Sequence, residues 1–481
     1  SFQLSSFIFF FLTAALVTAP LIIYLTIINP SAEQRIDALS GPLNKLTAGN
    51  PSEVIQSTLN TLGMFTLRGD AVPIYNVSDR PVFPEPISAA LFYLGLLVCL
   101  WRWKKPQYAL MSIWFIISLG PAMITPFSPN FVRTIASWPI PFVFVGIGLD
   151  EALQIAGRER RLARLRTLSL SRILAIFFAV VLIYNSFSTA RDYFINWPTG
   201  DYVRFWQQAT WTQAVRTLNA DPSTETVAAS GLSINTFDPQ TFDLLGLRSD
   251  IKVKWFDCRN AILFPAGRTI RYLIPAFFPC DQDLWSLFVW DAKLLNQPNW
   301  PGTQETIFAL YDFERPQSLA EGLASSAVFP PVYIGSERFE VDKPLQPIAT
   351  WVDFGGLRFC GPWIDQFTGN VAPKPGATVL IDTCWVLMQP VAPPLKIFVH
   401  ITAPDGKIFA QWDGLDVNVG TLEPGDMFIQ RHSLKLPSDL PSGPYRISLG
   451  VYNPDTDARL KAIINGQTID SIVLGQLDVT P

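Results

Sequence analysis

Residues 87–101, ISAALFYLGLLVCLW, contain no charged residue and are followed at once by the basic and aromatic run RWKK at 102–105. A helix needs about 20 apolar residues to cross the hydrocarbon of a bilayer. The run is short for that task, but Trp and basic residues at its end are typical of membrane-water interfaces. We therefore interpret residues 87–101 as a membrane-spanning helix rather than as part of a buried soluble core.

Four more apolar runs lie within the first 190 residues. They cover residues 4–28, 108–124, 135–153 and 172–190, whereas the last 290 residues alternate short apolar stretches with Pro, Gly, Asp and Asn. The sequence thus predicts a polytopic α-helical membrane domain of about five spans over residues 1–191.

The distribution of Lys and Arg predicts how this domain is oriented. Residues 102–105 hold three basic residues and residues 154–172 hold six arginines, whereas residues 29–86 and 125–134 hold few for their length. Short cytoplasmic loops retain Lys and Arg. We expect a membrane protein with its N-terminus on the cytoplasmic side and the residues after about 191 outside. The chain begins with Ser1, and its first run lacks the basic start and the cleavage site of a signal peptide. We therefore expect either the later part of a longer polytopic protein or a protein from which an N-terminal piece was removed.

The predicted outer loop, residues 29–86, is too long for a simple connection. Apolar residues recur at helical spacing in 36–46 and 55–62, and Asn50, Pro51 and Glu53 form a helix-start signal. Such amphipathic helices usually lie in the membrane interface. They either frame a site there or cover the ends of the spans.

Short motifs after these helices carry a resemblance to a known family. Met64-Phe65, Arg68-Gly69-Asp70, Asn76 and Arg80-Pro81 precede the run at 87–101, and a Pro-rich hinge at 126–129 precedes Arg133. Over residues 1–195 this order resembles the later, C-terminal half of bacterial GT-C-type membrane glycosyltransferases of the protein O-mannosyltransferase and aminoarabinose transferase type. The resemblance implies transfer of a polyprenyl-phosphate-linked sugar on the outer face of the membrane.

A lipid phosphate requires cationic groups near the headgroup plane, and a guanidinium can bind phosphate with two hydrogen bonds. Arg133 is the first candidate, with Arg68, Arg80 and Asp70 beside it in the motif region. Ion pairs with local carboxylates are the alternative role for these arginines.

The family's essential acidic motif is not recognisable here, although Glu33, Asp37, Glu53 and Asp70 are present. The catalytic residue is therefore unknown, and a non-catalytic, transferase-like accessory subunit of a larger membrane complex is the alternative function. Membrane lipid, a polyprenyl-phosphate sugar and other membrane subunits are the expected partners. The net charge of −4 argues against nucleic acid. No cofactor is evident, and a divalent metal stays an open alternative.

Two outer domains are expected after the membrane part. Residues 192–335 alternate predicted strands and helices, which indicates an extracytoplasmic α/β domain, and residues 336–481 show short strands between turn signals. The latter pattern predicts an antiparallel β-sandwich that resembles carbohydrate-binding domains.

Four cysteines lie in this predicted outer region, where disulfides persist. Sequence proximity favours Cys258 with Cys280 and Cys360 with Cys384, and free buried thiols are the alternative.

Overall fold

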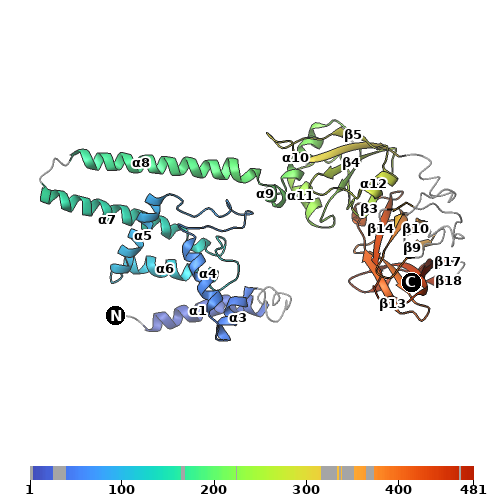
Figure 1. Ribbon diagram of the computed structural model, residues 1–481, viewed down its shortest axis with the longest axis horizontal. Helices are drawn as coiled ribbons and strands as arrows, with labels where there is room; N and C mark the ends of the chain where they lie inside the picture. The colour runs from blue at the N-terminus through green and yellow to red at the C-terminus, as the bar shows by residue number, and fades with distance from the viewer. Residues whose placement is uncertain are drawn as a thin grey trace. The chain divides into compact units, whose positions relative to one another are not determined.

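The computed structural model describes residues 4–24, 39–163, 168–223, 225–315, 333–334, 337–338, 352–363, 373–464 and 467–480. The chain forms two compact units, Ser1–Gln207 and Gln208–Pro481. In Figure 1 the first unit runs from blue to green and the second from green to red.

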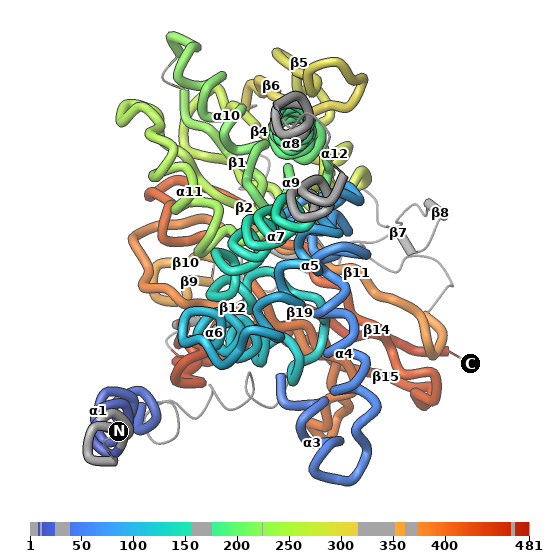
Figure 2. Tube along the Cα trace, turned by 90° about the vertical axis from the view of Figure 1, so that its left-hand side faces the viewer, coloured from blue at the N-terminus to red at the C-terminus, as the bar shows by residue number. Residues whose placement is uncertain are grey.

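The first unit is helical. Its described elements are α1 (Leu4–Ile23), α3 (Gly41–Thr47), α4 (Ser52–Gly63), α5 (Pro86–Trp101), α6 (Pro106–Met123), η2 (Ile135–Ser137), α7 (Pro139–Ala163), α8 (Leu168–Arg191), η3 (Asp192–Asn196), η4 (Trp197–Thr199) and α9 (Asp201–Trp206). Helices α5 and α7 lie side by side (Figure 2). A Cβ on Gly95 would lie 1.8 Å from the carbonyl oxygen of Phe144, so only glycine permits this close approach.

The predicted polytopic domain of about five spans is wrong. Among the described residues, one helical stretch, Ile135–Ile155, is long and apolar enough to cross a membrane. Helices α5 and α6 would pass that test only as one broken pair, and a bend of 119° separates them. The physical reason is that α5 ends at Trp101 after 16 residues, short of the roughly 20 that a span requires. Several arginines used to orient the domain lie outside the residues whose side chains are described.

The second unit begins with a mixed sheet. Its strand order is β2-β1-β4-β6-β5, in which β1 is parallel to β2 and β4, and β6 is antiparallel to β4 and β5. The strands are β1 (Val227–Ser230), β2 (Val253–Phe256), β4 (Thr269–Pro275), β5 (Lys293–Asn296) and β6 (Phe308–Glu314). The α/β part also contains three helices: α10 (Ala209–Ala220), α11 (Phe237–Leu245) and α12 (Gln282–Phe288).

The rest of the second unit is a β-sandwich. One sheet has the order β18-β17-β9-β10-β11-β14-β3, and the other has β13-β12-β15-β16 with β19 also paired to β15. The strands are β3 (Ala261–Phe264), β9 (Val352–Phe354), β10 (Leu357–Trp363), β11 (Thr378–Leu387), β12 (Lys396–Thr402), β13 (Ile408–Gly414), β14 (Met427–Lys435), β15 (Gly443–Asn453), β16 (Ala458–Arg459), β17 (Ala462–Ile464), β18 (Gln467–Ile469) and β19 (Ile472–Val479). A short hairpin, β7 (Tyr333–Ile334) and β8 (Glu337–Arg338), forms a separate two-stranded sheet.

The α/β part and the sandwich share one core. Strand β3 leaves the α/β part and pairs with β14 of the sandwich, and one cluster of buried apolar side chains extends across both. The guanidinium of Arg431 on β14 donates to Asp281, which caps α12, at 2.9 Å and to Asp382 on β11 at 2.8 Å. Burial nevertheless raises the pKa of the Asp382 carboxyl. These contacts join the two parts within one compact unit, Gln208–Pro481.

Candidate functional site

The motif region, residues 64–85 between α4 and α5, forms a loop in which residues 69–70 lie against residue 79. The Gly69 N–H donates to the Asp79 carbonyl at 3.0 Å, and the Asp79 N–H donates to the Asp70 carbonyl at 2.9 Å. A Cβ on Gly69 would lie 1.9 Å from the carbonyl oxygen of Arg80. The Arg-Gly-Asp motif is therefore explained by backbone packing at its glycine.

Asp70 connects this loop to the loop that carries Arg133. Its side chain is 1% exposed and accepts the N–H groups of Val72 and Phe131, each at 2.9 Å. A carboxylate held by two backbone donors acts as a clamp between loops. Both carboxylate oxygens of Asp70 are therefore engaged in holding the two loops together.

Arg68 and Arg80 both form ion pairs. Arg68 Nε lies 2.7 Å from Asp79 Oδ1, and this hydrogen bond raises the pKa of Arg68, whose side chain is 71% exposed. Arg80 Nε lies 3.1 Å from Asp192 Oδ2, and its Nη2 donates to the Thr189 hydroxyl at 3.0 Å. Their charges are compensated within the chain, which is the alternative role considered from the sequence.

Arg133 is different because its protein partners are neutral. Its Nη1 donates to the Thr125 hydroxyl at 2.7 Å and to the Pro126 carbonyl at 2.5 Å. Within the described parts of the chain, no carboxylate forms an ion pair with it, and its Nε and Nη2 have no protein partner. The guanidinium is anchored at one nitrogen and retains donors and charge for an anion.

Exposed apolar side chains surround the arginine in sequence. Phe127 is 80% exposed and adopts a φ of 61°, which is uncommon for a bulky residue. Val132 is 48% and Ile135 69% exposed. A cation flanked by exposed apolar groups suits an amphiphilic anion, which has a charged head and a hydrocarbon part.

In the second unit, the carboxyl ends of the parallel strands are the usual position for ligands in α/β sheets. Here the sandwich loop 416–418 lies against this region. The Asn418 N–H donates to the Trp255 carbonyl at the end of β2, and its side-chain amide donates to the Ile234 carbonyl in the loop after β1. This part of the sheet edge is therefore occupied by the protein's own backbone.

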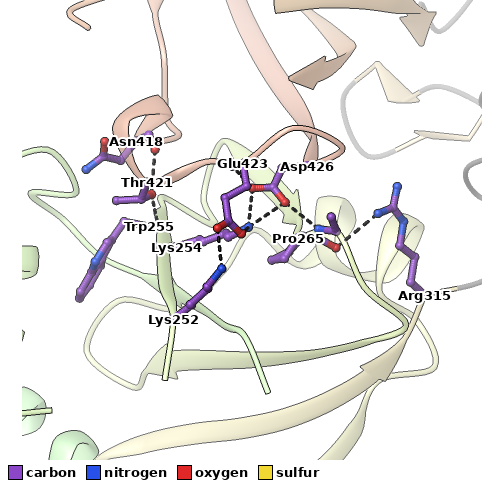
Figure 3. A network of polar contacts seen from close by, with 10 residues as sticks. Lys252, Lys254, Trp255, Pro265, Arg315, Asn418, Thr421, Glu423 and Asp426 are labelled. Carbon is purple, nitrogen blue, oxygen red and sulfur yellow. Dashed lines mark hydrogen bonds and ion pairs between the residues drawn. The ribbon is translucent and has the colours of Figure 1, made fainter. Parts of the chain in front are cut away.

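An ionic network centred on the buried Lys254 and Asp426 joins the α/β part to the sandwich (Figure 3). Lys254 Nζ lies 2.8 and 2.6 Å from the two carboxylate oxygens of Asp426 and 3.1 Å from Glu423 Oε2. Lys252 donates to the other oxygen of Glu423 at 2.6 Å. These lysines, Lys252 first, lower the pKa of Glu423. Both lysines and both carboxylates are paired, which indicates a structural role that sequence reasoning did not foresee.

The structure joins Cys258 to Cys280 and Cys360 to Cys384, the pairing that sequence proximity favours. Cys99 in α5 is a buried free thiol. Across the described ranges, no group of three or more His, Cys, Asp or Glu side chains could hold a metal ion.

No protein-family model matches the chain, and no curated protein matches it. Solved structures match parts of it. The C-terminal domain of Wzt is 18% identical, with a TM-score of 0.19, over 26% of this chain and 75% of that one. A glycosyl hydrolase family 2 member from Bacteroides cellulosilyticus is 14% identical, with a TM-score of 0.16, over 23% and 14%. An immunoglobulin-like protein from Pseudomonas aeruginosa is 15% identical, with a TM-score of 0.14, over 27% and 96%. Such low scores carry no argument about activity or ligand.

Proposed function

We propose that the first unit binds the phosphate of a polyprenyl-phosphate-linked sugar at the outer surface of a bacterial membrane, as the later half of a GT-C-type glycosyltransferase. The single observation that carries this proposal is Arg133, whose Nε and Nη2 have no partner among the described residues. A guanidinium with free donors can bind a phosphate with two hydrogen bonds.

The position of Arg133 along the chain supports a membrane-bound ligand. It directly precedes Ile135–Ile155, the described stretch that is long and apolar enough to cross a membrane. Arginines at the ends of such helices lie at the level of the lipid headgroups. The exposed Phe127 and Ile135 beside it supply apolar surface for the hydrocarbon part of the ligand.

A transferase-like accessory subunit is the second candidate. The acidic residues put forward from the sequence and described in the structure are already engaged: Glu53 pairs with Lys45, and Asp70 accepts two backbone N–H groups. Glu33 and Asp37 lie outside the described residues. A general base requires a carboxylate that can reach the acceptor. This favours a lipid-phosphate-binding half whose catalytic acid is supplied by another part of the assembly.

The test is binding of the full chain to phosphatidylcholine vesicles with and without undecaprenyl phosphate. Arg133→Ala should weaken the phosphate-dependent part by about 10- to 100-fold, as expected for lost hydrogen bonds to a charged group. Arg133→Lys should recover only part, because an ammonium lacks the planar fork. Arg68→Ala is the matched control, since that arginine is exposed and paired with Asp79. Unchanged phosphate-dependent binding by a folded Arg133→Ala protein would refute the proposal.

A further inference from the structure

Helix α4 buries two of its polar residues and exposes apolar ones. Ser57 and Thr61 are 8% and 0% exposed, whereas Ile55 and Leu59 are 54% and 60% exposed. A helix on the surface of a soluble protein shows the opposite arrangement. Hydrogen bonds from this side of the helix to other parts of the chain would explain why polar residues lie there.

The polar face of α4 holds the turn that precedes Arg133. Asn60 Nδ2 donates to the Ser128 carbonyl at 3.2 Å, and the Ser57 hydroxyl donates to the Thr125 carbonyl at 3.4 Å. One turn earlier on the helix, Gln56 Nε2 donates to Asn60 Oδ1 at 2.9 Å. This contact orients the Asn60 amide so that its NH₂ group faces the turn.

The same turn anchors the guanidinium. The Thr125 hydroxyl donates to the Pro121 carbonyl at 2.6 Å and accepts from Arg133 Nη1 at 2.7 Å. Because the hydroxyl proton is used toward Pro121, the oxygen lone pairs face the arginine. A continuous chain of contacts therefore runs from Gln56 through Asn60 to the turn 125–128 and on to Arg133.

We propose that Asn60, supported by Ser57, is a positioning residue for Arg133. The inference rests on the proposed function, because it concerns how the arginine is presented to a lipid phosphate. In this arrangement α4 contributes no group to the ligand. It holds the turn 125–128 at its polar face, and the turn directs the free Nε and Nη2 of Arg133 toward the anion.

The experiment measures binding of the full chain to phosphatidylcholine vesicles that contain undecaprenyl phosphate, for Asn60→Ala, Arg133→Ala and the double variant. Asn60→Ala should weaken phosphate-dependent binding by about two- to tenfold, the effect of one neutral hydrogen bond. The double variant should bind no more weakly than Arg133→Ala alone, because both changes act through one guanidinium. A merely structural role would weaken the double variant further.

Asn44→Ala on α3 is the matched control, since the side-chain amide of this exposed asparagine donates to the Ser40 hydroxyl, one helical turn away, and to no other described residue. It should bind like the unaltered protein. If Arg133→Ala loses binding but Asn60→Ala behaves like Asn44→Ala, the positioning inference is overturned and the proposed function stands. If Arg133→Ala retains binding, the proposed function fails, and the positioning inference that rests on it fails as well. Additive losses in the double variant also contradict the inference.

Discussion

Replacing Lys254 by Met should destabilise the second unit by about 3 kcal/mol or more, because removing one partner of a buried ion pair leaves an uncompensated charge. The Lys254 side chain is 2% exposed and that of Asp426 is 0% exposed, so water cannot replace the lost ammonium. Methionine matches the length of the aliphatic stem, so little packing is lost.

The magnitude can be bounded from the remaining contacts of Asp426. Its carboxylate would still accept the N–H groups of Ala266 at 2.6 Å and Glu423 at 2.7 Å. These donors stabilise the ionised form, which places the expected loss near the lower end of the roughly 3–5 kcal/mol typical of broken buried pairs.

Lys252→Met is the matched control. Lys252 pairs with the same Glu423 but is 63% exposed, so its removal should cost no more than about 1 kcal/mol. Urea unfolding of the full chain, followed by fluorescence of the buried Trp255 and Trp385, measures both variants. Equal losses for Lys254→Met and Lys252→Met would refute the reasoning that burial, rather than the ion pair itself, sets the cost.

Two further predictions concern pH and lipid. Burial lowers the pKa of His432 to about 3, below its ordinary 6.5, so folding favours the neutral ring. The contribution of His432 to the free energy of unfolding is complete above pH 6.5 and is lost as the pH falls toward 3, by at most about 1.4 kcal/mol per pH unit. In urea titrations across this range, the free energy of unfolding of His432→Gln should fall less steeply with falling pH. An equally steep fall in the variant would contradict the role of His432. Leu59→Ser on the exposed face of α4 should leave stability nearly unchanged but weaken binding to plain phosphatidylcholine vesicles by up to about tenfold. Leu295→Ser on the exposed strand β5 serves as its control, and equal binding by the two variants would exclude a lipid contact for α4.

Runs of apolar residues predict the positions of helices well. The apolar runs coincide with helices such as α5 and α6, but run length alone does not reveal the bend of 119° between them. Strand β14 contains Gln430, Arg431 and His432, which are residue types that usually lie on protein surfaces. All three are buried, and their partners come from distant positions such as Asp382. Burial of polar residues by tertiary partners leaves no local signal in the sequence.

In the candidate site, too, the sequence predicts local features but not the tertiary partners of the side chains. The sequence selects four candidate residues, three between α4 and α5 and Arg133 after α6. The charge balance of each depends on partners that sequence spacing does not supply, such as Asp192 for Arg80. The helix-start signal at Asn50 predicts α4, and Asn50 Oδ1 does accept the Ser52 N–H at 3.1 Å. The signal does not predict that the polar side of α4 would face inward.

The difference between Arg80 and Arg133 explains why one of two similar residues becomes the candidate. An arginine held by a carboxylate has no net charge to offer, and an anion would have to displace that carboxylate. An arginine held by a hydroxyl and a carbonyl is positioned at little electrostatic cost and keeps its positive charge. Neutral acceptors are thus the better anchors for a phosphate-binding guanidinium. This is why the contacts from α4 to the turn 125–128, themselves uncharged, matter for an interaction that is electrostatic.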